Sequence, residues 1–219
     1  MDSARTRGFR RFEQEREEMI DLIRHRGVTD ELLIAAMRRI DRHEFVDTPF
    51  LNRSYEDSAL PIGCSQTISQ PYTVAFMTQA LGAKPGDRVL EVGTGSGYQA
   101  VVLAEMGMRV FTIERHMPLL VEARRRFEKF SYNIASKCGD GTLGWSEFCP
   151  YRGIIVTAGA PEPPQSLLDQ LDEGGVLVIP IGGMDLQDIH RITRRGDRYA
   201  TQHTAGFKFV PLIGKSGWK

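Results

Sequence analysis

Three glycines at alternate positions directly follow an apolar segment near the middle of the chain: Gly93, Gly95 and Gly97. Glycines at such a turn let the backbone approach a ligand with no side chain in the way. Glu114 ends the next apolar segment, and Asp140 follows a third, weaker one. A carboxylate at the first position is typical of ribose recognition, and one at the second could accept a hydrogen bond from the adenine amine. The set indicates an adenosine-containing ligand.

The spacing of the glycines narrows the choice of ligand. Dinucleotide-binding loops follow G-x-G-x-x-G, whereas this loop is G-x-G-x-G and continues with Tyr98. A pyrophosphate cofactor is therefore disfavoured. S-adenosylmethionine fits, because its ribose and adenine would meet the two acids while the loop makes room for its amino-acid part. The alternative is a purely structural turn with two strand-end caps.

Strands and helices alternate around this loop. Near-continuous apolar runs, typical of strands buried on both faces, begin at Arg88, Arg109, Gly153 and Gly175, and a weaker strand covers 134–138. Helical stretches lie between them, at 99–106, 118–130 and 164–171. With right-handed crossovers, this order gives an α/β fold with a doubly wound, Rossmann-like parallel sheet. The glycine loop then lies in the crevice at the carboxyl ends of the strands.

The residues before the sheet form a helical extension and a loop. Helical spacing runs from Glu13 to Ile40, with Gly27 ending the first helix and Thr29 as the N-cap of the second. The segment 45–71 reads as a long loop without structure of its own, and loops of that length are usually functional. Pro71 then opens a helix with an apolar inner face: Val74, Met77 and Leu81.

The C-terminal part reads as an antiparallel edge of the sheet. The strands expected there cover 189–194 and 206–213, on either side of the turn Gly196-Asp197. We expect one globular domain, in which residues 1–82, the helices and loop, pack on a core formed by 83–219.

Composition excludes several classes of protein. The chain has 219 residues with 28 Lys+Arg against 28 Asp+Glu, so there is no long-range field to gather nucleic acid. The arginines at 5, 7, 10 and 11 are followed by acids at 13, 15, 17 and 18, as in a solvated helix end.

The three cysteines form no C-x-x-C, and the charged N-terminus does not resemble a signal peptide. Both observations favour a reducing cytoplasm. We expect no membrane span, no metal at the five histidines, and a monomer.

Several short segments of the chain resemble sequence motifs of the protein-L-isoaspartate O-methyltransferases, which repair isomerised aspartyl and asparaginyl sites. The most specific segment, Thr67-Ile68-Ser69-Gln70-Pro71, precedes the glycine loop. The similarity covers about residues 30–213 in the order of the family. The other matching segments are Phe45-Val46, Tyr55-Glu56-Asp57, 60–63, 89–98, 139–141, 154–158, 171–175 and 209–212. One departure is Cys64-Ser65, where the family commonly has glycine before the glutamine, and it bears on the shape of the substrate loop.

The resemblance implies a role for individual residues. The active-site serine of the family falls on Ser69. The cofactor-binding residues implied, which include the whole glycine loop, are Glu91, Gly93, Thr94, Gly95, Ser96, Gly97, Glu114, Asp140 and Gly141. The substrate contacts implied are Gln66, Thr67, Ile68, Thr157, Ala158, Val210, Pro211 and Leu212. The implied activity moves a methyl group from S-adenosylmethionine to the free α-carboxylate of L-isoaspartyl residues in damaged proteins and peptides.

The chemistry of that acceptor agrees with the residues present. An α-carboxylate has a reference pKa near 3.5, so it is ionised at neutral pH and needs no general base. Charge disappears from both reactants in the transition state, so a cationic clamp on the carboxylate would favour the ground state. A neutral hydroxyl such as Ser69 would orient it without that penalty. The alternative for Ser69 is a cap on the helix that starts at Pro71.

Two other functions remain open at this point. One is an S-adenosylmethionine-dependent methyltransferase of RNA or small molecules. Amine methylases of nucleic acids commonly place an [Asn/Asp/Ser]-Pro-Pro-[Tyr/Phe] motif after the fourth strand, where this chain has Thr157-Ala158-Gly159-Ala160-Pro161. The other is a non-catalytic module that binds adenosylmethionine or carboxyl-containing peptides.

Overall fold

Seven strands form the main sheet of the computed structural model, which describes residues 3–219, with side chains from residue 11 onward. The strand order is β5-β4-β3-β6-β7-β8-β9. The pairs from β5 to β7 are parallel, and β8 and β9 add antiparallel pairs. The bounds are β3 (Arg88–Val92), β4 (Arg109–Glu114), β5 (Ala135–Cys138), β6 (Tyr151–Val156), β7 (Leu171–Gly182), β8 (Gln187–Arg195) and β9 (Arg198–Phe207). The predicted doubly wound sheet with an antiparallel C-terminal edge is confirmed.

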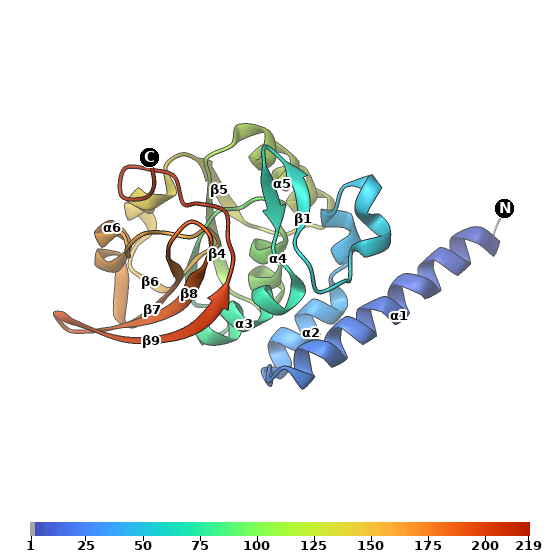
Figure 1. The fold of residues 1–219 in the computed structure, drawn as a ribbon, viewed down its shortest axis with the longest axis horizontal. Coiled ribbons are helices and arrows are strands. Elements are labelled where there is room, and N and C mark those ends of the chain that lie inside the picture. Colours follow the sequence, from blue (N-terminus) through green and yellow to red (C-terminus); the bar gives the residue numbers. More distant parts are fainter. Residues whose placement is uncertain (1–2) are drawn as a thin grey trace.

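Helices cover both faces of this sheet (Figure 1). On one face, apolar side chains of α3 (Pro71–Leu81), α4 (Tyr98–Glu105) and α5 (Met117–Lys129) pack in one core with Val89. On the other face, Leu90 belongs to a second core, with α6 (Gln165–Asp169). Val89 and Leu90 of β3 thus point to opposite cores, which is why both faces of this strand carry apolar residues. Because the chain leaves β3 toward β4 on one side and reaches β6 on the other, the crevice of the sheet lies beside the end of β3.

Two helices precede the sheet, and Figure 1 shows α1 reaching outward from the body of the molecule. They are α1 (Ser3–His25) and α2 (Glu31–Arg39), and their predicted apolar stripes are buried. The predicted N-cap of α2 is wrong: Asp30, not Thr29, accepts from the backbone N–H groups of Leu32 and Leu33, at 3.0 and 3.1 Å. The N–H of Thr29 instead donates to the side chain of Gln79 on α3. The side chains of the arginines at 5, 7 and 10 lie outside the described residues.

The expected unstructured loop at 45–71 contains regular structure. After the short 3-10 helices η1 (Arg42–Phe45) and η2 (Thr48–Arg53), the strands β1 (Leu60–Gly63) and β2 (Gln66–Ile68) form an antiparallel hairpin. Its turn puts Cys64 and Ser65 at φ 50° and 57°, a conformation that favours glycine. Neither cysteine nor serine is typical of such a turn, so the hairpin could not be predicted from the sequence. The departure from the family pattern at Cys64-Ser65 is located at this tip.

The second C-terminal strand was placed wrongly, at 206–213. The hairpin after Gly196 leads directly into β9, whose side chains from Arg198 to Gly206 are all exposed, so no apolar alternation marked it. The chain then leaves the sheet and crosses toward the end of β6. There the Gly159 N–H donates to the Val210 carbonyl at 2.8 Å, and the Leu212 N–H to the Gly159 carbonyl at 2.7 Å.

No helix within residues 3–219 has the length and the apolar character that crossing a membrane requires.

Candidate active site

The glycine loop follows β3 and packs against the end of β6. This packing leaves no room for a side chain at Gly93. Gly93 has φ 101°, and a Cβ atom at this position would lie 2.3 Å from Oγ1 of Thr157. That hydroxyl donates to the carbonyl of Gly93 at 2.8 Å. The loop is therefore fixed against the neighbouring strand end, with its backbone open to the crevice.

Glu114, at the end of β4, holds the other side of the same loop. It is 4% exposed. One carboxylate oxygen accepts from the Gly95 N–H at 2.9 Å, and the other from the His116 N–H at 2.8 Å. Because each carboxylate oxygen has two acceptor sites, these bonds leave capacity for ribose hydroxyls.

Glu91 lies fully buried in the middle of β3. The Thr112 hydroxyl donates to its Oε2 at 2.5 Å, while its Oε1 is buried without a partner among the described residues. Burial raises the pKa of Glu91 to about 8, the Thr112 bond opposes this rise, and the nearby Glu114 adds to it. With this pKa the carboxyl is protonated at neutral pH, and its unpartnered Oε1 is available to a polar group of a ligand.

Two adjoining cavities bring most of the predicted residues together. The first is lined by both glycine-loop and C-terminal residues, including Gln66, Thr67, Gly93, Gly95, Glu114, Gly141, Thr157, Ala158, Val210, Pro211 and Leu212. The second is lined, among others, by Thr67, Ile68, Ser69, Glu91, Gly93, Thr94, Gly95, Ser96 and Thr157. Because Thr67, Gly93, Gly95 and Thr157 line both, the cavities form one cleft.

Asp140 and Gly97, both predicted to contact the cofactor, are not among the residues that line these two cavities. The Asp140 carboxylate accepts from the N–H and hydroxyl of Thr142, at 2.9 and 2.7 Å, and from the N–H of Lys215 at 2.7 Å. Partial burial raises the pKa of this carboxyl, but the hydrogen bonds from Thr142 and Lys215 outweigh it and lower the pKa. Gly97 faces α5, where a Cβ would lie 2.7 Å from the Phe127 ring.

The C-terminal turn that Asp140 holds lies next to the cleft. The Trp218 N–H donates to the carbonyl of Leu212 at 2.8 Å, and its indole N–H to the carbonyl of Gly159 at 3.0 Å. Leu212 itself lines the first cavity. The last residues of the chain thus support one wall of the site.

Ser69 does not cap the helix that follows it. The N-cap position of α3 is Gln70, which makes no side-chain cap, and the Tyr72 N–H of the first turn donates to Asp57 at 2.9 Å. The remote Asp57 therefore supplies the cap, and the Ser69 side chain lines the second cavity. The capping alternative is wrong.

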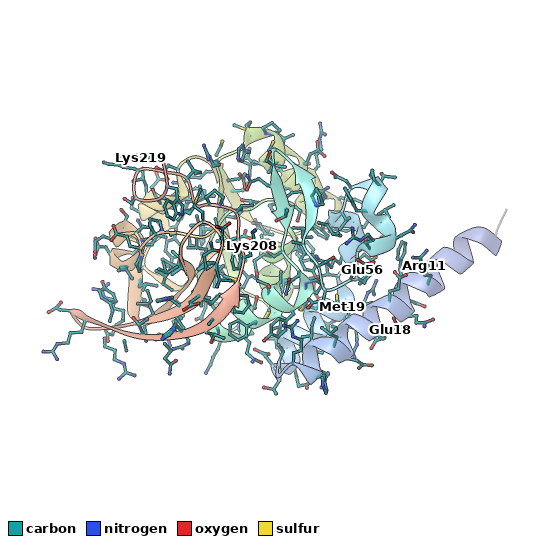
Figure 2. The ribbon with its side chains drawn as sticks, viewed as in Figure 1. Arg11, Glu18, Met19, Glu56, Lys208 and Lys219 are labelled. Carbon is teal, nitrogen blue, oxygen red and sulfur yellow. The ribbon has the colours of Figure 1, made fainter. Side chains whose placement is uncertain are left out.

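Sequence reasoning missed four residues around the cleft: Arg42, Asp57, Arg115 and Lys208. Arg115 lines the first cavity, and Lys208 lines a third, small one together with Ser69. Figure 2 labels Lys208 just beyond the end of β9. Asp57 carried a signal within the segment Tyr55-Glu56-Asp57, and Arg115 and Lys208 directly adjoin Glu114 and the segment 209–212. Arg42 carried none, because its partners Ser54 and Ser69 are distant in sequence.

One further cavity lies away from the cleft, and the described residues do not meet the requirements of a metal site. A cavity between α1 and the segment 52–57 is lined by Glu18, Met19 and Glu56, among others, all labelled in Figure 2. Among the described residues, no group of three or more His, Cys, Asp or Glu side chains could hold a metal ion.

Comparison with known proteins supports the resemblance noted in the sequence. The family model described as protein-L-isoaspartate(D-aspartate) O-methyltransferase matches residues 13–217. A protein-L-isoaspartate O-methyltransferase of Dictyoglomus thermophilum is 47% identical over 209 residues, which are 95% of each chain. A solved protein-L-isoaspartate O-methyltransferase is 29% identical, with a TM-score of 0.83 over 92% of this chain and 67% of its own.

A second solved structure shares the fold at 24% identity and a TM-score of 0.78, over 90% of this chain and 98% of its own. It is a provisionally named protein-L-isoaspartate O-methyltransferase from Plasmodium falciparum, in complex with S-adenosyl-L-homocysteine. Since the family model covers nearly the whole chain and the relatives match from end to end, the chain belongs to the protein-L-isoaspartate(D-aspartate) O-methyltransferase family.

Proposed function

We propose that this chain is a repair enzyme that methylates the free α-carboxylate of L-isoaspartyl residues in damaged proteins and peptides, with S-adenosylmethionine as the methyl donor. Family membership supports the reaction and the acceptor. The single structural observation that carries it is the pair of adjoining cavities that share Gly93, Gly95 and the residues Thr67 and Thr157, with Glu114 lining one cavity and Ser69 the other.

The residues present fit the cofactor. The glycine loop leaves backbone space where a Cβ atom would collide with Thr157, and Glu114 offers free acceptor sites at the end of β4. The buried Oε1 of Glu91 has no protein partner among the described residues, so it would bind the amino group of the cofactor, and that positive charge would favour the ionised carboxylate. When bound, S-adenosylmethionine supplies an electrophilic methyl group on a sulfonium.

The residues of this chain then have to position the acceptor. The carboxylate oxygen forms the new bond to the methyl carbon as the carbon–sulfur bond breaks, and no proton moves. Ser69 is proposed to donate a hydrogen bond that orients the carboxylate. Gln66, Thr67 and Ile68 on the hairpin, Thr157 and Ala158 after β6, and the segment Val210-Pro211-Leu212 are proposed to hold the peptide around it. Orientation of this kind lowers a barrier by about 7–11 kcal/mol.

The cellular setting is proposed from the cysteines. Cys64, Cys138 and Cys149 are all free thiols, and two of them are exposed, which supports a reducing cytoplasm. We propose that the enzyme acts there as a monomer on isoaspartyl proteins.

A matched pair of peptides tests the function. Isoaspartyl and aspartyl peptides of one sequence carry the same charge, so only geometry separates them, and a misplacement of about 1 Å costs on the order of a hundredfold in rate. We expect kcat/KM for the isoaspartyl peptide to be higher by at least that factor, measured with labelled S-adenosylmethionine. Equal rates on both peptides would contradict the repair function. Inactivity on both with methylation of RNA would favour the rival methyltransferase.

A further inference from the structure

Arg42, at the start of η1, is fully buried. No other lysine or arginine is buried among the residues whose side chains are described. A buried charge is costly unless it is paired, yet no carboxylate within those residues forms a salt bridge with Arg42. An uncompensated guanidinium in a protein core calls for a role that an apolar side chain of similar volume would not fill.

The guanidinium of Arg42 instead joins three segments of the cleft region. Its Nε donates to the carbonyl of Ser54 and its Nη2 to the carbonyl of Ser69, both at 2.8 Å. Its central carbon lies 4.7 Å from the ring centroid of Tyr98, directly after the glycine loop. Because the guanidinium is planar and rigid, two of its N–H groups fix the relative positions of the carbonyls that they bind.

Among the described residues, the bond from Arg42 to the Ser69 carbonyl is the hydrogen bond by which another side chain holds Ser69. It lies between β2 and α3, its side chain caps neither element, and it lines both the second and the third cavity. The placement of its hydroxyl therefore follows from the placement of its backbone, which the Arg42 bond fixes.

We propose that Arg42 is a positioning residue for methyl transfer: by binding the Ser69 carbonyl and stacking on Tyr98, it sets the Ser69 hydroxyl at a fixed place relative to the glycine loop. This inference rests on the proposed function of Ser69. Arg42 is not among the residues that line the three cavities, and it acts through the backbone of Ser69.

Arg191 offers a matched control. Its Nε donates to the carbonyl of Ala80 at 2.8 Å, near the opposite end of α3, and its Nη1 to the Thr193 hydroxyl at 2.9 Å. Both arginines thus hold a carbonyl at one end of the same helix. Neither Ala80 nor Arg191 is among the residues lining the cleft. Because Arg191 is only half-buried, the comparison is made at equal loss of Tm: a purely structural role predicts that equal drops in Tm bring equal losses of kcat/KM.

The experiment compares Arg42→Lys and Arg42→Gln with Arg191→Lys and Arg191→Gln in the full chain. For each variant, kcat and KM are measured with an isoaspartyl peptide, Kd for S-adenosylmethionine by calorimetry, and Tm by circular dichroism. Lysine keeps the charge but not the planar fork, and glutamine keeps a small planar donor without charge. The kinetics are recorded well below the lowest Tm.

We expect both Arg42 variants to lose about tenfold or more in kcat/KM, while Kd for S-adenosylmethionine stays within about threefold. The Arg191 variants should lower Tm but keep kcat/KM within about twofold. The proposal is overturned if Arg42→Lys keeps wild-type kcat/KM, if its loss matches that of an Arg191 variant with an equal drop in Tm, or if cofactor affinity falls in parallel. If Arg42→Gln does not fold, Arg42→Lys decides. A wild-type enzyme inactive on isoaspartyl peptides would reject the proposed function instead.

Discussion

The two sides of the cleft are built in different ways. On the cofactor side, Glu114 and Thr157 lie at strand ends and bind the glycine loop across neighbouring parallel strands. On the acceptor side, Ser69 lies in a connection whose shape depends on Arg42 and Asp57, both of which come from earlier turns. The sheet therefore positions the first side directly, whereas single side chains reaching across the sequence position the second. Substitutions should separate the two sides.

Glu91 gives the cofactor side a pH-dependent stability. Its pKa is raised from 4.5 to about 8 in the folded protein, so unfolding releases a proton between these values and stability falls as pH rises through that window. Glu91→Gln removes this dependence. We expect the difference in unfolding free energy between variant and wild type to change by about 1.4 kcal/mol per pH unit from pH 5 to 8, in favour of the variant. Denaturant unfolding at several pH values measures it, with the exposed Glu122→Gln as control. A difference that does not vary with pH would place the Glu91 pKa outside the window.

Glu114→Ala tests the cofactor side at its strand end. The change removes acceptors for ribose and the partners of the Gly95 and His116 N–H groups. A hydrogen bond to a charged group contributes about 1.5–3 kcal/mol, so the loss of one such bond should lower affinity for S-adenosylmethionine by about tenfold to a few hundredfold. Calorimetry on the folded variant checks this, beside Glu122→Ala. Unchanged affinity would remove Glu114 from the site.

Ser69→Ala tests the acceptor side. With the capping alternative eliminated, we expect kcat to fall by about tenfold to a hundredfold while Tm and cofactor affinity remain near wild type. Kinetics with an isoaspartyl peptide and thermal melts decide, with the exposed Ser146→Ala as control. Activity at the wild-type level would show that another group orients the acceptor.

Asp57→Ala should have the smallest effect. The change leaves the Tyr72 N–H at the start of α3 without its partner and also removes the ion pair of Asp57 with Arg26. Loss of a cap costs about 0.5–2 kcal/mol, and a surface ion pair adds less. Unfolding free energy should fall by this amount, with cofactor affinity unchanged. Asp47, an N-cap residue that makes no cap hydrogen bond, provides the control through Asp47→Ala. Equal stability of the two variants would remove Asp57 as the cap of α3.

The contrast between the two sides also explains what the sequence could reveal. The central parallel strands and Glu114 were predictable because such strands are mainly apolar and their ends meet at one edge. The hairpin at 60–68 was not predictable, since its turn places Cys64 and Ser65 in a conformation usually marked by glycine. β9 was misplaced because an exposed edge strand has no apolar alternation.

Long-range contacts limited the prediction of the site. The pairing of Arg42 with Ser69 joins residues from separate turns, and no spacing rule connects them. For Asp140, the position after β5 was read correctly, but the sequence did not show that Lys215 and Thr142 use its oxygens. Local patterns locate strand ends, whereas the partners of a side chain depend on how distant segments pack.

The support that the C-terminal turn gives to the cleft has a practical consequence for handling the protein. Lys215 and Trp218 are tied to Asp140 and Gly159, so the last residue, Lys219, follows directly on a wall of the site. A purification tag fused after Lys219 would lie next to the contacts of Lys215 and Trp218 and could displace them. Helix α1, at the other end, extends outward from the body of the molecule, as Figure 1 shows. Affinity handles and surface immobilisation therefore belong at the N-terminus, and an assay of a C-terminally tagged preparation should be repeated after cleavage of the tag.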